Sequence, residues 1–313
     1  MLSYRGIYAK PEGSVRGVAA AQFAAQADEG VLHRLGGAAQ LPGDLAVAAA
    51  GQVGRQHLPL EPDAGRDELL GRFAAAGLRL GVSGPAGWGV AIPGPFDYDT
   101  GVGRFHGVGK FESLNGVDVG AALRDLLVAD GVRFLNDADA FGIGEAAVGA
   151  ARGQARAVCL TLGSGIGSTF LADGLPVKTG GAIPSGGFVH TLRYAGRPLE
   201  DSMSRRALRA AYRQATGRDL DVRELADQVR AGEPDAARVW EAGFDAMTAA
   251  IAPWLRSFGA DLVVVGGSIA RSWDLVGPSL AEGFDAAGAL VTVVPAAHPD
   301  DAALFGAARW AQR

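Results

Sequence analysis

Short apolar runs and amphipathic segments alternate along the chain after about residue 65. Strands are predicted where apolar runs end at turn residues, namely 88–92, 131–135, 157–162, 168–172, 175–178 and 261–265. Helices are predicted from apolar spacing at 67–76, 117–127, 141–151, most of 204–255 and 302–312. Upstream, the alanine-rich stretch 18–26 favours a helix, whereas 41–54 has neither period. Strands that alternate with helices are typical of an α/β fold.

Composition and charge narrow the class of protein. The chain has 313 residues, enough for two domains, with 48% hydrophobic and 20% charged residues. The net charge of −5 provides no basic field for nucleic acid or an anionic membrane. No apolar stretch reaches the ~18 residues that a membrane span needs. We therefore expect a cytoplasmic protein without nucleic-acid or membrane partners. The one cysteine, Cys159, lies in an apolar run and is expected in the core.

Glycine turns follow two of the predicted buried strands. The first is Gly163-Ser164-Gly165-Ile166-Gly167, and the second is Gly266-Gly267-Ser268. Such turns can aim backbone N–H groups at a phosphate, and a side chain at Gly163, Gly165 or Gly167 would block its approach. The structural alternative for the first turn is a tight hairpin that needs positive φ. Both interpretations remain open at this point.

Polar side chains stand at the end of another strand. Asn136 and Asp137 follow the strand 131–135 and precede a predicted helix. A carboxylate there can accept a proton from a hydroxyl bound at the carboxyl ends of the strands. The alternative is structural, because Asp137 or Asp139 could cap the helix.

A histidine and a glutamate follow a third, glycine-rich segment at 180–187. His190 and Glu200 are ten residues apart and could bind sugar hydroxyls or lie on the surface. No second histidine or cysteine flanks His190 at a metal-ligand spacing. The other four histidines are scattered and expected in solvent or core positions: His33, His57, His106 and His298.

Taken in order, these segments resemble the ROK family of sugar kinases and related repressors. The matching stretches are 89–97, 136–153, 160–167 and 264–268, so the resemblance covers about residue 65 to the end of the chain. It implies an α/β, two-lobed actin-like ATPase (ribonuclease H-like) fold with a central cleft. The lobes would comprise 1–133 with the closing helix 302–313, and 134–301 with the nucleotide and sugar loops.

The resemblance also assigns roles. It makes Asp137 the general base of an ATP-dependent sugar kinase. Sugar contacts would come from Asn136, His190, Glu200 and Gly94, whereas nucleotide contacts would come from Gly163, Ser164, Gly165, Gly167, Gly266 and Gly267. The cofactors implied are ATP and Mg²⁺, the partners are a sugar and ATP, and the oligomeric state could be a homodimer.

Three departures from the family pattern affect these expectations. The Asp-x-Gly-Gly-Thr phosphate turn that opens the family fold has no match in the first sixty residues. The segment 193–199 lacks the family's zinc cysteines, so we expect no zinc and no other protein-held metal. Gly187 stands where the family has a sugar-binding glutamate, in Gly186-Gly187-Phe188-Val189-His190.

The leading functional hypothesis is a kinase that phosphorylates a hexose hydroxyl, the 6-OH of glucose or of a glucose-like sugar. The lost carboxylate at Gly187 makes an aminohexose such as kanosamine, in an antibiotic pathway, an alternative acceptor. A catalytically inactive sugar-binding relative is a second alternative, favoured by the missing phosphate turn and opposed by Asp137. A repressor is disfavoured, since residues 1–60 hold five Lys/Arg against four Asp/Glu and show no paired-helix pattern.

Overall fold

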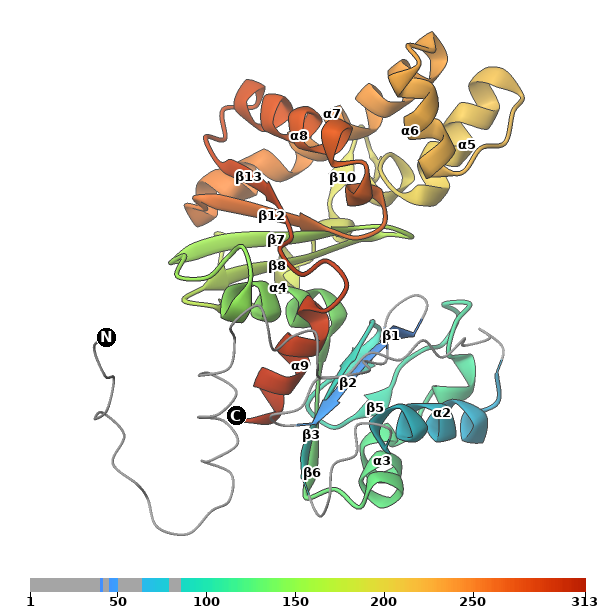
Figure 1. The fold of residues 1–313 in the computed structure, drawn as a ribbon, viewed down its shortest axis with the longest axis vertical. Helices are drawn as coiled ribbons and strands as arrows, with labels where there is room; N and C mark the ends of the chain where they lie inside the picture. The colour runs from blue at the N-terminus through green and yellow to red at the C-terminus, as the bar shows by residue number, and fades with distance from the viewer. Residues whose placement is uncertain (1–39, 42–44, 50–63, 79–85) are drawn as a thin grey trace, which may run out of the picture.

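Two β-sheets with separate cores form the protein, and two helices lie between them (Figure 1). This computed structural model describes residues 40–41, 45–49, 64–78 and 86–313. The helix predicted at 18–26 lies outside the described residues. Of the first sixty residues, which have no match to the family's phosphate turn, the structure describes only two short strands near residues 40–49.

The first sheet has the strand order β1-β2-β3-β6. Its strands are Gln40–Leu41 (β1), Leu45–Ala49 (β2), Gly87–Ile92 (β3) and Gly131–Asn136 (β6). Strands β1, β2 and β3 pair antiparallel, and β3 pairs parallel with β6. Helices Arg66–Leu78 (α2) and Val119–Leu127 (α3) contribute to the associated core, in which Leu69, Leu70 and Phe73 of α2 are buried as their helical spacing predicts.

Short elements connect this sheet to the cleft described below. Strands Phe96–Asp97 (β4) and Val102–Gly103 (β5) form a small antiparallel pair after β3. A 3₁₀ turn at Glu112–Leu114 (η1) precedes α3. Helix α3 begins where the Asp118 carboxylate accepts a hydrogen bond from the Ala121 amide at 2.7 Å, a normal N-cap.

The second sheet has the strand order β13-β12-β7-β8-β9. Its strands are Arg156–Leu162 (β7), Ile166–Ala172 (β8), Leu175–Pro176 (β9), Leu262–Gly266 (β12) and Thr292–Pro295 (β13). Strands β7, β8 and β9 are antiparallel, whereas β7, β12 and β13 are parallel. The helices on this side are Arg205–Thr216 (α5), Val222–Arg230 (α6), Pro234–Phe258 (α7) and Trp273–Ala286 (α8).

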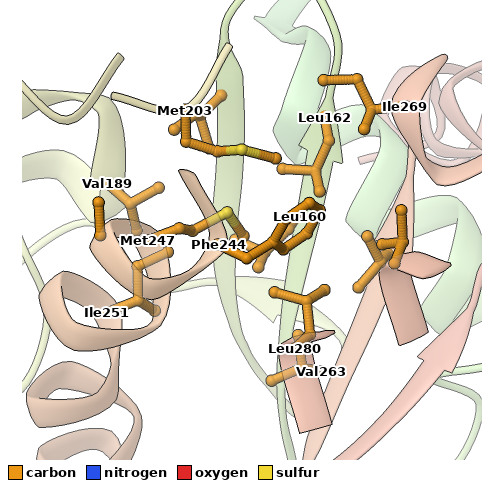
Figure 2. Packing of buried hydrophobic residues seen from close by; sticks show 14 of the residues in the cluster. Leu160, Leu162, Val189, Met203, Phe244, Met247, Ile251, Val263, Ile269 and Leu280 are labelled. Carbon is orange, nitrogen blue, oxygen red and sulfur yellow. The ribbon is translucent and has the colours of Figure 1, made fainter. Parts of the chain in front are cut away.

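The core on this side consists of buried side chains between the second sheet and these helices. Figure 2 shows Leu160 of β7 beside Phe244 and Met247 of α7, and Val263 of β12 beside Leu280 of α8. Burying each such side chain contributes roughly 1.5–3 kcal/mol to the stability of the fold. This packing holds the sheet that carries the glycine turns against its helices. Cys159 is buried on the same strand, as its apolar surroundings predict.

Helices Asp137–Val148 (α4) and Ala302–Ala311 (α9) lie between the sheets and approach each other at backbone distance. A Cβ added at Gly144 of α4 would overlap the carbonyl of Ala302, and one added at Gly306 of α9 would overlap the carbonyl of Ala140. Strand β3 is as close, because a Cβ at Gly89 would overlap the carbonyl of Ala307. Only glycine permits this packing.

Most predicted elements agree with the structure, with differences at their ends. The helix predicted at 141–151 begins earlier, at Asp137, and strand β9 ends at Pro176 rather than reaching 178. Helix α8 and strand β13 were not predicted. Both lie in the stretch between β12 and α9, where Pro278 inside α8 and scattered polar residues obscure the period.

The division into lobes follows the two sheets. The predicted boundary at 133 falls inside β6, which continues to Asn136. We propose that the lobes meet where β6 passes into α4, and that α9 belongs with the first lobe because it contacts β2, β3 and β6.

The glycine contacts between α4 and α9 predict opposite effects for two identical substitutions. Gly144→Ala should destabilise the protein by roughly 1–3 kcal/mol, because the methyl group has no space against Ala302. Gly71→Ala in α2 is the matched control, since nothing lies within 4 Å of its added Cβ, and it should stabilise by about 1 kcal/mol. Urea unfolding measures both values, and equal shifts in the two variants would contradict the tight contact.

Candidate active site

The candidate site is centred on the amino end of α4. Asn136 is the N-cap: its Oδ1 accepts hydrogen bonds from the amides of Ala138 at 3.0 Å and Asp139 at 3.4 Å. The interpretation of Asp137 or Asp139 as the cap is therefore wrong. Asp137 is instead the first helical residue and is half-buried, at the end where the helix dipole favours a carboxylate, and its Oδ1 also accepts a hydrogen bond from the Ala138 amide at 3.0 Å.

Tyr98 fixes the other side of Asn136. The Asn136 Nδ2 donates to the Tyr98 hydroxyl at 3.2 Å, and that hydroxyl donates to the carbonyl of Ile92 at 3.2 Å. The hydroxyl also lies 3.4 Å from the position that a Cβ on Gly94 would take. Burial raises the pKa of Tyr98 well above its usual value, so the phenol stays protonated. Sequence reasoning missed Tyr98, because its partner is contributed by a strand 38 residues away.

A cleft of about 900 Å³ opens beside these residues. Asn136 lines it from β6, Tyr98 from the turn after β4, Asp139 from α4, and Lys178 and Phe188 from the segment after β9. The predicted sugar-side residues Asn136 and Gly94 thus lie at this cleft or beside Tyr98. Lys178 is a second residue that the sequence analysis missed.

The turn Gly163–Gly167 connects β7 to β8 as a hairpin, in which the Gly163 amide donates to the carbonyl of Gly165 at 3.0 Å. None of its three glycines lies in the left-handed region, so the expectation that a hairpin here needs positive φ is wrong. The amides of Ser164 and Gly165 donate to no group among the described residues. These two N–H groups of the turn could donate hydrogen bonds to a phosphate.

The three glycines of the turn have different surroundings. A Cβ at Gly165 would overlap the Glu200 carboxylate, and one at Gly167 would overlap the Thr161 hydroxyl. A Cβ at Gly163 would meet only the Ser268 hydroxyl, at an ordinary 3.5 Å. The protein's own packing therefore explains glycine at 165 and 167 but not at 163.

The second glycine turn lies next to the first. Gly266 pairs with Thr161 across the parallel strands β12 and β7. Gly267, with φ of 91°, contacts the backbone of Leu162 so closely that no side chain fits. The two turns thus share the carboxyl ends of adjacent parallel strands, where α/β sheets bind ligands. Ala138 of α4 borders the same edge, 3.1 Å from a Cβ placed on Gly167.

Glu200 reaches this edge from a separate segment. Its Oε1 accepts a hydrogen bond from the Ile166 amide at 2.8 Å. Glu200 lies in the 3₁₀ turn Leu199–Asp201 (η4), which follows the antiparallel pair Arg193–Tyr194 (β10) and Arg197–Pro198 (β11). Ala195 and Gly196 connect these strands at φ of 48° and 79°, as a type I′ turn requires. A tight hairpin thus occupies the segment in which the family has its zinc loop.

His190 is exposed, unlike Glu200. It lies in the 3₁₀ turn Val189–Thr191 (η3), and its ring centroid is 5.4 Å from that of Phe188. The Val189 amide is fixed by the Ser168 hydroxyl at 2.9 Å, which places the segment beside β8. The preceding 3₁₀ turn, Ser185–Gly187 (η2), contains Gly187 at φ of 76°, a conformation unfavourable for a glutamate.

No group of three or more histidine, cysteine, aspartate or glutamate side chains is arranged for a metal among the residues that the structure describes. No described helix combines the length and apolar character that crossing a bilayer requires.

Comparison with known proteins agrees with this architecture. A ROK hexokinase structure from Thermus thermophilus superimposes with a TM-score of 0.62 at 25% identity, over 80% of this chain and 87% of that one. A ROK glucokinase structure from Streptomyces griseus, in complex with glucose and AMPPNP, gives a TM-score of 0.65 at 19% identity, over 80% and 89%. The protein therefore has the two-lobed actin-like ATPase fold.

The sequence comparisons are more specific. The profile of the ROK family matches residues 85–313. The glucokinase of Thermotoga maritima is 26% identical over 235 residues, 68% of this chain and 73% of that protein. The chain belongs to the ROK family, and the resemblance noted in the sequence is confirmed.

The space beside Gly163 gives a test for the phosphate turn. Gly163→Ala should lower ATP affinity by about tenfold, equivalent to ~1.4 kcal/mol, because the methyl group would occupy the approach of a phosphate to the neighbouring amides. The fold should be unaffected, since the methyl contact with Ser268 is ordinary. Titration calorimetry measures affinity, with Gly65→Ala, which also has an open Cβ position, as control. Unchanged affinity would leave the turn with a hairpin role alone.

Proposed function

We propose that this ROK-family protein is an ATP-dependent kinase that phosphorylates a hexose hydroxyl, the 6-OH of glucose or of a glucose-like sugar. The observation that carries the proposal is the half-buried Asp137 at the amino end of α4, where Asn136 already provides the cap. The kinase names of the Thermotoga maritima and Thermus thermophilus relatives support the same reaction class.

The proposed chemistry is phosphoryl transfer to an alcohol. The hydroxyl oxygen attacks the γ-phosphorus, the bond from that phosphorus to the β–γ bridging oxygen breaks, and the hydroxyl proton passes to the Asp137 carboxylate. Positioning and charge stabilisation dominate such reactions. The position of Asp137 on a capped helix meets the first requirement, because the Asn136 hydrogen bonds fix the first turn of α4.

The nucleotide would bind at the adjoining glycine turns. In this proposal the amides of Ser164 and Gly165 donate hydrogen bonds to phosphate oxygens, and Gly163 and Gly167 leave room for the phosphates. The second turn, Gly266 and Gly267, borders the nucleoside. The shared edge of β7 and β12 supports this arrangement, because it brings both turns together. Mg²⁺ would be held largely by phosphate oxygens and water, the ligands that this hard cation prefers.

The sugar would bind between the lobes. Asn136 uses Oδ1 for the cap and one Nδ2 hydrogen for Tyr98, so its second Nδ2 hydrogen remains for a sugar oxygen. Glu200 uses Oε1 for Ile166, and its Oε2 would accept a hydroxyl. His190 and the Gly94 backbone complete the proposed set. His190 is exposed, and closure of the segment 180–191 over a sugar would bury it.

Glycine at position 187 favours two alternatives to a glucose kinase, one with a different acceptor and one without catalysis. Without the family's carboxylate, the pocket could take an aminohexose such as kanosamine, or the protein could bind a sugar without phosphorylating it. A screen of hexoses and aminohexoses with ATP, read by ADP release, distinguishes the three. Turnover of glucose supports the main proposal, turnover of aminohexoses alone supports the first alternative, and binding without turnover supports the second.

Asp137 provides the decisive test of the kinase. Asp137→Asn should lower kcat by about 10²-fold or more, the usual scale of general base catalysis, with sugar binding nearly intact. The helix should not be affected, because the cap belongs to Asn136. The matched control is Asp219→Asn, which removes a surface carboxylate paired with Arg209 and should leave kcat within about twofold. Wild-type turnover by Asp137→Asn would exclude Asp137 as the base.

A further inference from the structure

We infer that Lys178 is a positioning residue that ties the sugar-side segment 180–191 to the amino end of α4, in place of the side chain that Gly187 lacks. The inference deepens the proposed function, and its consequence for sugar affinity rests on that function. The tie itself is a property of the unliganded protein, so it can be tested separately.

The first contact of Lys178 is an ion pair with the catalytic helix. Its ammonium lies 2.7 Å from Oδ1 and 2.5 Å from Oδ2 of Asp139, two residues after Asp137. The Asp139 side chain is only 7% exposed, whereas that of Lys178 is 39% exposed and lines the cleft. A carboxylate this deeply buried requires a partner, so removing the lysine leaves an uncompensated charge.

Burial alone raises the pKa of Asp139, and the Lys178 ammonium opposes that rise. The net pKa stays raised, and the lysine favours the charged form of the carboxylate, in which both oxygens accept hydrogen bonds. A charged pair at the border of a cleft becomes stronger when a ligand excludes water from it.

The other contacts of Lys178 are with the segment before His190. The ammonium donates to the carbonyl of Gly186 at 3.2 Å and lies 4.8 Å from the centroid of the Phe188 ring, a cation–π distance. Phe188 in turn contacts the ring of His190. One side chain thus connects α4 to the residues on both sides of Gly187.

Gly187 cannot make this connection itself. Its φ of 76° is strained for any side chain, and an added Cβ would lie 3.3 Å from the carbonyl of Val177. Its backbone is already engaged, since its amide donates to Pro184 at 2.8 Å and its carbonyl accepts from Ser168 at 2.7 Å. Because the conformation of η2 leaves no room for a side chain at position 187, the contact between this segment and α4 is made by Lys178.

The energetic consequence concerns the ordering of the segment. Glycines at 180, 181, 186 and 187 give this segment a large conformational entropy when it is free. A segment that is ordered before the ligand arrives does not incur that cost upon binding. Loss of Lys178 should therefore weaken sugar binding specifically, because the glycine turns of the nucleotide site are held by other contacts.

Lys178→Met retains the apolar stem and removes the charge. In the free protein, hydrogen exchange of amides in 180–191 should accelerate by about tenfold or more, as expected when local opening becomes easier by ~1.4 kcal/mol. The Kd and KM for the sugar should rise by about tenfold, with the KM for ATP within about twofold. Lys178→Arg, which retains the charge, should restore most of the affinity. Lys110→Met, on a half-buried lysine whose ammonium lies 6.0 Å from the centroid of the Phe111 ring, is the matched control and should change neither measurement.

A double-mutant cycle with Asp139→Asn isolates the ion pair. If the two side chains act together, the double variant should exchange and bind sugar no worse than Lys178→Met alone. Strictly multiplicative effects would show that the two residues act independently and would overturn the inference.

The remaining outcomes separate this inference from the kinase assignment. Unchanged exchange at 180–191 in Lys178→Met would overturn the inference, whatever the activity. Equal losses for sugar and ATP with a lowered Tm would also overturn it, because they indicate a general loss of stability. Accelerated exchange in a protein that phosphorylates no hexose would support the tie and refute the proposed function instead.

Discussion

The backbone contact between α4 and α9 is the constraint on which the arrangement of the protein depends. Gly144 and Gly306 each face a carbonyl of the opposite helix, and Gly89 brings α9 equally close to β3. Three elements from distant parts of the chain are thereby fixed at distances that no other residue type permits. Because α4 begins at Asp137 and α9 contacts β2, β3 and β6, this contact sets where Asp137 stands relative to the first sheet.

The amino end of α4 concentrates the polar interactions of the cleft. Asn136 caps the helix, Tyr98 fixes the amide of Asn136, and Lys178 neutralises Asp139. Each of these residues satisfies a buried polar group that would otherwise cost free energy. Asp137 lies among them, where the helix dipole favours its charged form, and its Oδ1 accepts a hydrogen bond from the Ala138 amide at 3.0 Å.

The sequence predicted the framework of the fold but not the connections within the site. Strands β3, β7 and β12 and their glycine turns have local signals, since apolar runs end at Gly or Pro. The pairings Tyr98–Asn136, Lys178–Asp139 and Ile166–Glu200 join residues 34 to 39 positions apart, and no local period encodes them. Capping by Asp137 or Asp139 was left open as the structural alternative because Asn and Asp both favour that position, and only the backbone geometry places Asn136 there.

The position of the α4–α9 crossing has a mechanical consequence for any motion of the lobes. Gly144 and Ala140 lie within two turns of Asp137 on a continuous helix, so a rotation of the two sheets about this crossing would displace Asp137 only slightly. The segment 180–191 is joined to the same end of α4 through Lys178, so in such a rotation it would move together with Asp137. Such a geometry keeps Asp137 and the segment joined to its helix nearly stationary while parts of the protein farther from the crossing move apart.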